Sequence, residues 1–368
     1  MLSIDVIIPS YRLLSEYLLP IVQMDIPEDA QVRFLIIADN PKAEIPSEIG
    51  PFIDNKKVIL IRNPENLGVC KTRNIGIESS TADWLLFLDD DVKPSKNLLL
   101  SYASAIHNNP ADVGFFGDVV FPSATNSFTA GIRASGMLGL FSVPKESTYR
   151  KWTPTANVIV KKSAIGDVRF NEVFAKNGAG EEIDFFLRIY KSTNKELRGI
   201  KNAEVYHNWW YNGKRIYSRF IRWNTGIALL PNIFPEYKYK TFPNIAETVV
   251  FGLPIVILWS ILAHSFLPIT SAIAGIIGGE IFGESLRLRF SMGLLQTRFA
   301  FEVIIIRGLN DMGRLITQIK TPEMLKGICE RFDVMCDGKN LRQQRFWAGV
   351  KFISYLVITA LFYYLLSR

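Results

Sequence analysis

The sequence predicts an α/β protein with a mostly parallel central sheet, followed by an α-helical region associated with a membrane. Its first half alternates short apolar runs with helix-like stretches, which is typical of successive β-α-β units. One such run, Trp84–Leu88, ends abruptly in the three acids Asp89, Asp90 and Asp91. A strand buried on both faces has this composition, and ligands bind at the carboxyl ends of such strands. The second half of the chain contains three long apolar stretches.

The elements of the first half follow in order from these patterns. Before residue 90 the predicted strands are Ile4–Ile8, Val32–Ala38, Val58–Ile61 and Trp84–Leu88. A helical pattern runs through Val22, and a second one covers Lys71–Ser79. Further strands are expected at Val113–Phe121, Ala156–Val160 and Glu204–Tyr206, with a helix over Glu181–Tyr190. Residues 117–157 read as mostly irregular loops.

The composition favours a membrane surface over nucleic acid as the partner of a basic chain. The 368 residues carry a net charge of +7 and have a mean hydropathy of +0.15, with the apolar excess late in the chain. The basic residues cluster near the apolar stretches, so anionic lipid and a nucleoside diphosphate explain the charge better. The three cysteines, Cys70, Cys329 and Cys336, fit a reducing compartment and lack metal-ligand spacing.

Three apolar stretches predict a membrane region after about residue 230. Thr248–Gly283 is almost free of charge until Glu280 and is just long enough for two spans, with a break at His264–Pro268. It is expected to form a tight hairpin or a re-entrant pair. Phe346–Leu366 is the third stretch, and the basic segment before it predicts amphipathic helices on the cytosolic leaflet. Buried core helices are the alternative, which the length and lack of charge disfavour.

Four regions follow from these changes in composition. We expect a first domain over residues 1–230, an interfacial segment and hairpin over 231–285, basic amphipathic helices over 286–345, and a transmembrane helix over 346–368. Because Met1 runs straight into a strand, we expect no signal peptide. The predicted protein is therefore a multi-pass protein of the cell membrane whose first domain lies in the cytosol.

Five short motifs occur in an order that resembles a known enzyme family. They are Ile7–Tyr11, Ala38–Asn40, Asn66–Gly68 with Arg73–Gly76, Leu88–Asp91, and Gly180–Asp184. Together they resemble a family 2 glycosyltransferase of the GT-A fold, which has a Rossmann-like sheet, over about residues 3–225. No single motif is specific, but five in sequence order are. The resemblance implies transfer of a sugar from a nucleotide-sugar donor.

The resemblance implies that Pro9, Tyr11 and Asp39 hold the nucleotide. A carboxylate at Asp39 can accept hydrogen bonds from a base or from ribose hydroxyls, although a turn residue is a serious alternative. Arg73 lies in the motif that borders the donor site and is able to pair with diphosphate charge. A solvated helix face explains Arg73 nearly as well.

The aspartate triplet is expected to hold a divalent cation. Along an extended chain, Asp89 and Asp91 point to the same side and Asp90 to the other. The resemblance implies that Asp91 binds the metal, that Asp89 contacts ribose or the metal shell, and that His207 completes the site. Asp90 is placed among the donor-binding residues, though it is the most dispensable of the three. Carboxylate and imidazole ligands suit Mn²⁺ or Mg²⁺, whereas a helix N-cap and an ordinary strand-end histidine are the alternatives.

Two acids at the start of a helix are the candidates for the catalytic base. Glu182 occupies the position where the family usually has an aspartate, and Glu181 is the alternative. The N-terminus of a helix stabilises a negative charge, which keeps such a base ionised. Arg222 and Trp223 partly match an element of processive synthases and are tentative contacts for acceptor and diphosphate. An amphipathic helix that meets the membrane is an equally good interpretation.

These features predict an inverting, metal-dependent transfer of a sugar, with a UDP-sugar favoured, to a hydroxyl of a lipid-linked glycan. Such a reaction serves polysaccharide or cell-surface glycan synthesis. A hydroxyl is a weak acid and needs a base, whereas a phosphate acceptor does not. A polyprenyl-phosphate glycosyltransferase and a processive synthase acting as a homo-oligomer stay open. So does a catalytically inactive scaffold that binds glycans or proteins.

Overall fold

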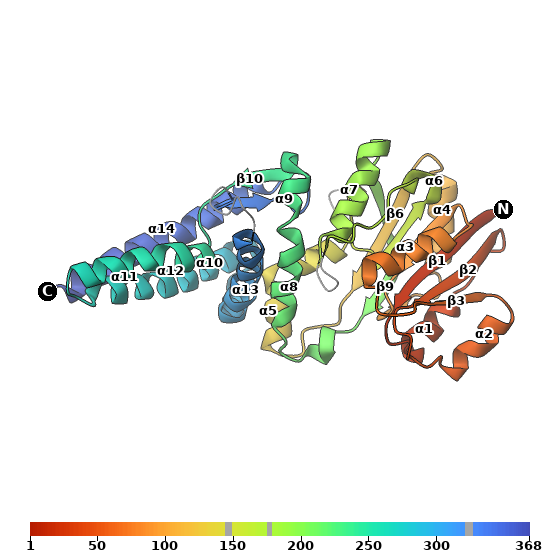
Figure 1. Ribbon diagram of the computed structural model, residues 1–368, viewed down its shortest axis with the longest axis horizontal. Helices are drawn as coiled ribbons and strands as arrows, with labels where there is room; N and C mark the ends of the chain where they lie inside the picture. Colours follow the sequence, from red (N-terminus) through yellow and green to blue (C-terminus); the bar gives the residue numbers. More distant parts are fainter. Residues whose placement is uncertain (144–148, 175–178, 321–326) are drawn as a thin grey trace. The chain divides into compact units, whose positions relative to one another are not determined.

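The computed structural model describes residues 1–143, 149–174, 179–320 and 327–368, and these form two compact units (Figure 1). The first unit contains Met1–Ser123 and Leu138–Asn212, and the second contains Ala124–Met137 and Gly213–Arg368. The boundaries predicted near residues 230, 285 and 345 stay predictions, because a division into compact units does not test where functional domains begin and end.

The first unit is built on a nine-stranded sheet with strand order β3-β2-β1-β4-β8-β6-β9-β5, to which β7 adds by pairing with β9. The strands are β1 (Leu2–Ser10), β2 (Ala30–Ala38), β3 (Val58–Arg62), β4 (Trp84–Leu88), β5 (Val92–Pro94), β6 (Gly114–Val120), β7 (Tyr149–Arg150), β8 (Asn157–Lys161) and β9 (Leu197–His207). The helices are α1 (Ser15–Val22), α2 (Gly50–Asp54), α3 (Val69–Ser79), α4 (Leu98–Asn108), α6 (Lys162–Ile165) and α7 (Glu181–Thr193).

The pairing of the strands confirms the predicted α/β class. Strands β3, β2, β1 and β4 are parallel, so their carboxyl ends meet at one edge of the sheet. β8 lies antiparallel between β4 and β6, and β6 runs parallel to β9. All five residues of β4 are buried, as expected for a strand covered on both faces. The aspartate triplet therefore starts at the edge where a ligand binds in such sheets.

One prediction about local structure was wrong. In the described part of residues 117–157, a helix, α5 (Ser127–Ser135), stands where irregular loops were predicted between the two strands. The side chain of Asn126 accepts a hydrogen bond from the Thr129 backbone N–H at 2.9 Å, and Gly136 ends the helix with a φ of 86°. A polar N-cap residue, followed at the end of the helix by a glycine in the left-handed conformation, is a helix signal. It was overlooked because the apolar pattern between the two residues is short. This helix belongs to the second unit.

The second unit is mainly helical. Besides α5 it contains α8 (Ser218–Ile227), α9 (Leu230–Ile233), α10 (Ile245–Glu247), α11 (Leu253–Leu262), α12 (Leu267–Met292), α13 (Ala300–Ile319) and α14 (Leu341–Leu366), with β10 (Lys238–Lys240) paired to β11 (Glu330–Phe332). Among the described residues, three helical segments are long and apolar enough to cross a membrane: Ile245–Leu262, Leu267–Met292 and Leu341–Leu366.

These segments refine the predicted spans. The chain turns between α11 and α12, where the sequence predicts a break, and α14 begins at Leu341 rather than at Phe346. A segment of 18 residues is about 27 Å long and one of 26 residues about 39 Å, against a hydrocarbon core of about 30 Å. The two longer helices are therefore longer than the apolar core of a bilayer is thick.

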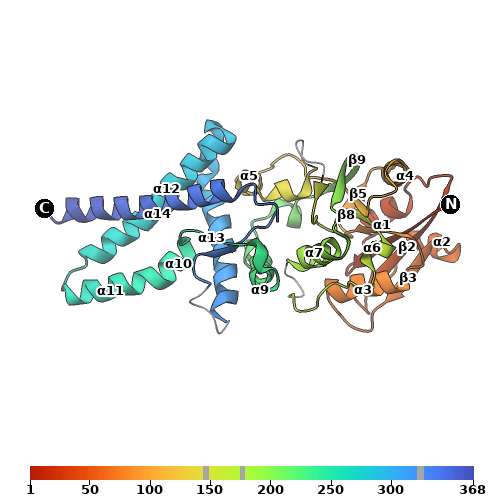
Figure 2. The ribbon, with the colours of Figure 1, turned by 90° about the horizontal axis from the view of Figure 1, so that it is seen from above.

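Three glycines spaced four residues apart allow α12 to pack closely against α14 (Figures 1 and 2). A Cβ atom built at Gly279 would lie 2.4 Å from the Tyr355 ring and 2.9 Å from its backbone nitrogen. Cβ atoms at Gly275 and Gly283 would also collide with α14. A G-x-x-x-G spacing in an apolar helix is a known signal for close helix contact in membranes, and it was missed in the sequence.

We expect Gly279→Ala to lower the stability of the second unit by about 1–3 kcal/mol, because the added methyl group overpacks the contact with α14. Gly278→Ala is the matched control, since a Cβ there meets the side chain of Ile358 at 3.3 Å. Thermal unfolding of the full chain in detergent measures both. Equal unfolding temperatures for the two variants would contradict the close contact.

Candidate functional site

The aspartate triplet follows β4 and contacts the end of β1. Asp90 accepts a hydrogen bond from the hydroxyl of Ser10 at 2.6 Å. Its other oxygen lies 3.5 Å from the guanidinium of Arg12, which is also 3.9 Å from Asp91. Burial raises the pKa of Asp90, and the Ser10 hydrogen bond opposes that rise. Asp90 thus links two neighbouring strand ends and fixes the turn that presents its neighbours.

Asp91 is paired with His207. The two residues meet because β5 pairs with β9, which places Val92 opposite His207. The Nε2 atom of His207 lies 3.3 Å from a carboxylate oxygen of Asp91, while Nδ1 contacts the backbone oxygen of Asn208. Phe121 stacks on the imidazole with ring centroids 4.9 Å apart. Burial lowers the pKa of His207, but Asp91, the Asn208 backbone and Asp89 together raise it above its ordinary value.

The buried guanidinium of Arg73, on α3, lies close to three carboxylates. Its guanidinium lies 3.2 Å from Asp89, 3.4 Å from Glu181 and 3.8 Å from Glu182, and its side chain is 5% exposed. Burial lowers the pKa of Arg73, and the three carboxylates more than restore it. The pKa of Asp89 is raised to about 6 by burial, with Arg73 opposing the rise. Arg73 is therefore engaged by protein carboxylates, and its predicted role in binding the donor stays a prediction.

The two glutamates open α7 after Gly180, whose φ of 107° requires glycine. One oxygen of Glu182 accepts hydrogen bonds from the backbone N–H of Thr155, at 2.8 Å, and from its hydroxyl. The side chain of Glu182 is 19% exposed and that of Glu181 is 7% exposed. Burial, followed by the charge of Glu182, raises the pKa of Glu181 to about 7. Of the two, Glu182 is the acid that solvent or substrate reaches.

The raised pKa of Glu181 predicts a dependence of stability on pH. Its folded pKa of about 7 exceeds the ordinary value of 4.5, so stability is lost as the pH rises through that interval. We expect Glu181→Gln to flatten the fall in unfolding temperature between about pH 5 and pH 8. Glu172→Gln, at an exposed glutamate, is the control and should keep the wild-type slope. An unchanged slope in Glu181→Gln would contradict this reading.

Asp39 is largely engaged by the protein itself. It accepts hydrogen bonds from Asn63 at 2.8 Å and from the backbone N–H groups of Leu67 and Gly68 at 2.8 and 2.9 Å. These bonds shape the loop that precedes α3, and they leave part of the acceptor capacity of the carboxylate unused. Pro9 lies in β1 and is partly buried, whereas Tyr11 follows the strand and is 52% exposed. A nucleotide-binding role for the three stays a prediction.

Arg222 and Trp223 lie on α8 in the second unit. α8 packs against α13, where Asn224 donates a hydrogen bond to Asn310 at 2.8 Å. The guanidinium of Arg219 lies 5.3 Å from the centre of the Trp223 ring. The proposed contact of Arg222 and Trp223 with acceptor and diphosphate stays a prediction.

Three contributors to the site were missed in the sequence: Ser10, Arg12 and Thr155. Ser10 and Arg12 flank Tyr11 after the first strand, so their position at a strand end was the available signal. Thr155 precedes β8 and donates a hydrogen bond to Glu182, which lies 27 positions later in the chain. No local sequence pattern predicts such a contact.

The residues present fit a divalent cation as a two-ligand site. In the part of the chain that the structure describes, no group of three or more His, Cys, Asp and Glu side chains is arranged to hold a metal ion. Asp91 and His207 do meet, whereas Asp89 turns toward Arg73. One carboxylate and one imidazole suit Mn²⁺ or Mg²⁺, with the other positions left to diphosphate oxygens and water.

Comparison with known proteins identifies the first part of the chain. Residues 5–174 match the family model described as Glycosyl transferase family 2. This segment is therefore similar to family 2 glycosyltransferases. The motif-based resemblance is thereby confirmed over the segment that carries Asp39, Arg73 and the aspartate triplet. The match ends before Glu181, Glu182 and His207.

Two curated relatives match a smaller part of the chain. An uncharacterized glycosyltransferase of Haemophilus influenzae is 32% identical over 88 residues, which are 24% of this chain and 29% of the relative. An uncharacterized protein of the same organism is 33% identical over 88 residues, 23% of this chain and 48% of that protein. The chain thus spans less than half the length of these relatives.

Solved structures of glycosyltransferases are more distant. The fragment 1–349 of S. aureus TarS in complex with UDP-GlcNAc has 14% identity and a TM-score of 0.44, covering 62% of this chain and 66% of that one. The mannosyltransferase PcManGT from Pyrobaculum calidifontis in complex with GDP-Man and Mn²⁺ has 12% identity and a TM-score of 0.49, covering 83% and 86%. Since both TM-scores lie below 0.5, neither likeness bears on the function of this chain.

Proposed function

We propose that the chain transfers a sugar from a nucleotide-sugar donor to a hydroxyl of a membrane-anchored acceptor, with a divalent cation and with inversion. The observation that carries this proposal is the arrangement of acids in the first unit. The Asp91–His207 pair and the acids around Arg73 belong to the unit that contains most of the segment matched by the family 2 glycosyltransferase model. Asp89 and Asp91 follow the buried strand β4, at the edge of the sheet where ligands bind.

The donor diphosphate would be held by Asp91 and His207 through Mn²⁺ or Mg²⁺. When bound, such a cation neutralises the charge that develops on the leaving diphosphate. Arg12 is the protein cation best placed to add to this effect. Its side chain is 50% exposed and lies within 4 Å of both Asp90 and Asp91, whereas Arg73 is buried among acids. Arg12 therefore takes the diphosphate role that the sequence suggested for Arg73.

Glu182 would act as the base that accepts the proton of the acceptor hydroxyl. Thr155 orients one of its oxygens, and within the described residues the other oxygen has no hydrogen-bond partner. A base needs such a fixed but open oxygen within reach of the proton it accepts. Attack by the hydroxyl on the side opposite the diphosphate inverts the anomeric carbon in a single displacement.

The three apolar helical segments support an acceptor that is itself held in a membrane, such as a lipid-linked glycan of polysaccharide or cell-surface synthesis. The arginines and lysines of residues 286–345 would place the catalytic unit on the cytosolic side of the cell membrane. A polyprenyl phosphate acceptor is already anionic and needs no base, so the open oxygen of Glu182 favours a hydroxyl acceptor. Association of several copies would be needed for a processive synthase, since three spans enclose no hydrated pore.

A donor screen tests the proposal. The purified full chain in detergent is mixed with Mn²⁺ and a panel of UDP-, GDP- and dTDP-sugars, beginning with the UDP-sugars, and the released nucleotide is detected by luminescence. We expect turnover of one donor, or of a small group, that stops when the metal is chelated. Absence of turnover with every donor, in protein that is folded and carries its membrane segments, would overturn the proposed activity.

A further inference from the structure

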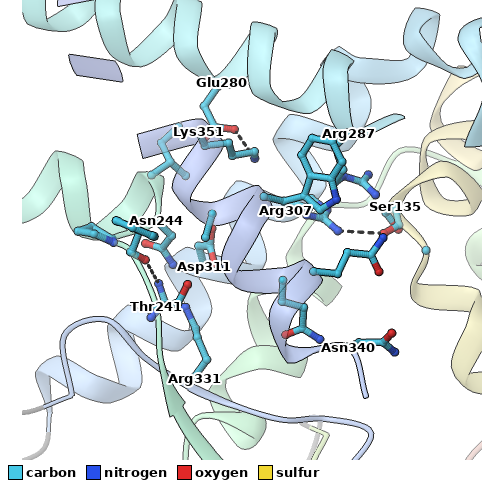
Figure 3. A pocket seen from close by; sticks show the side chains of 18 of the residues that line it. Ser135, Thr241, Asn244, Glu280, Arg287, Arg307, Asp311, Arg331, Asn340 and Lys351 are labelled. Atoms are coloured by element: carbon cyan, nitrogen blue, oxygen red, sulfur yellow. Dashed lines mark hydrogen bonds and ion pairs between the residues drawn. The ribbon is translucent and has the colours of Figure 1, made fainter. Parts of the chain in front are cut away.

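A polar cavity of about 580 Å³ lies inside the second unit, between α12, α13 and α14 (Figure 3). Figure 3 shows side chains from these helices and from the segment before α10 directed around it, among them Asn244, Arg307, Asp311 and Lys351. Its volume is that of a small-molecule site. The residues that line it all belong to the second unit, so the site described above, which lies in the first unit, does not account for it.

The cavity lies at one common end of the three apolar segments. The chain begins the first segment at Ile245, leaves the second at Met292 and begins the third near Asn340, and all three residues line the cavity. Because the first and third segments run away from this end and the second returns to it, the cavity sits where all three would meet one face of a bilayer. Lipid headgroups occupy that level of a membrane.

Three buried hydrogen-bond donors of the cavity lack partners among the described residues. They are the Nε1–H of Trp347, the Nδ2 amide of Asn244 and the hydroxyl of Thr241. The Oδ1 atom of Asn244 is engaged as the cap of α10, so its amide group alone is left over. Since buried polar groups are nearly always paired, unpaired donors at a cavity indicate a bound ligand or water that accepts hydrogen bonds.

Among the described cations that line the cavity, one has only weak partners. Arg287, Arg331 and Lys351 each have a close carboxylate partner on the protein. Arg307 has weaker partners, the backbone oxygen of Ser135 at 3.5 Å and Glu284 at 3.8 Å. A guanidinium in this situation can still donate two hydrogen bonds to a planar pair of oxygens, such as those of a phosphate.

Asp311 adds an acceptor to this set of donors. It lines the cavity from α13, the same helix as Arg307, and none of the hydrogen bonds or ion pairs of the described residues involves it. A carboxylate there would repel a bare phosphate but would accept a hydrogen bond from a hydroxyl beside it. The set therefore fits a phosphate that carries a hydroxylated group.

We propose that this cavity binds the headgroup of an anionic phospholipid. Its phosphate would accept hydrogen bonds from Arg307 and from the unpaired donors, and a headgroup hydroxyl would donate to Asp311. Free phosphate shares the first part of this chemistry but would not be held at the membrane surface by acyl chains. The proposal does not rest on the proposed transferase activity, since it uses residues of the second unit alone.

Binding of phosphatidylglycerol to the full chain in detergent tests the proposal, with native mass spectrometry to count bound lipid. We expect one tightly held phosphatidylglycerol per chain and much weaker retention of phosphatidylcholine. Arg307→Gln should weaken binding about tenfold, the usual effect of losing a charge-assisted hydrogen bond. Arg289→Gln removes the same charge from an exposed position of α12 outside the cavity, and should change binding less than about twofold.

A second variant separates loss of the site from loss of the fold. Trp347→Phe keeps an aromatic ring in the contact with Phe290 and Phe346 but removes the unpaired N–H, so binding should weaken a few-fold at an unchanged unfolding temperature. Equal binding by Arg307→Gln and Arg289→Gln would overturn the proposal, as would equal retention of phosphatidylcholine. Displacement of the lipid by millimolar inorganic phosphate would identify a free-anion site instead. Nucleotide-sugar turnover is measured separately, so the lipid-binding proposal and the proposed transferase activity can each be contradicted without the other.

Discussion

Sugar transfer by the Asp91→Ala variant is expected to fall on the order of a thousandfold, the effect of losing several kcal/mol of transition-state stabilisation. Asp91 is the acid of the triplet that meets His207, and its removal leaves one protein ligand for the cation. Initial rates with saturating donor, at several Mn²⁺ concentrations, measure the effect. Excess metal should restore little activity, because the carboxylate itself is missing.

Asp83→Ala is the matched control for that experiment. Asp83 precedes the other end of β4, where it accepts a hydrogen bond from the exposed Ser3 hydroxyl at 2.7 Å. This variant removes one aspartate at the opposite end of β4 without changing the site, so its rate should stay close to that of the wild type. Full activity of Asp91→Ala would show that the cation is held elsewhere.

The Glu182→Gln variant is expected to transfer sugar to a hydroxyl acceptor about 10²–10⁴ times more slowly, the usual contribution of a general base. Glutamine keeps an oxygen that Thr155 can orient, but it cannot accept the proton. Affinity for the donor should be unchanged, so the loss should fall on kcat. Single-turnover rates with a hydroxyl acceptor, together with nucleotide binding, separate the two quantities.

Glu181→Gln is the companion variant, and it distinguishes the two glutamates. Because Glu181 is buried against Arg73, its replacement should alter stability more than the rate of transfer. A larger loss of rate in Glu181→Gln than in Glu182→Gln would move the role of base to Glu181. Retained activity in both variants would indicate an acceptor that needs no base, such as a polyprenyl phosphate.

Much of the sheet could be predicted because its strands are short apolar runs with sharp ends. Trp84–Leu88 was located to the residue, since three acids follow five apolar side chains. The sharp end of this strand pointed to the aspartate triplet, because ligands in such sheets bind where strands stop, whereas the roles predicted for Asp91 and His207 came from the family resemblance. Local patterns were sufficient to predict a strand and a candidate site residue wherever both lie in the same short segment.

Contacts between distant segments could not be predicted. Arg73 and Glu181 are 108 positions apart, so nothing near Arg73 announced that protein acids would occupy it. α5 was missed because it is short, and because it lies in sequence between strands of the first unit while belonging to the second unit. The glycines of α12 were visible in the sequence, but their meaning depends on α14, which lies about seventy residues later.

Calorimetric titration of UDP and GDP into the full chain, with and without Mn²⁺, tests the central claim most directly. A donor site formed by Asp91 and His207 predicts that one of these nucleotides binds on the order of ten- to a hundredfold tighter with the metal, the scale on which ligand-shell changes act. Asp91→Ala should abolish that difference. Metal-independent binding of equal strength in wild type and variant, or no binding of either nucleotide, would contradict a metal–diphosphate site at the end of β4.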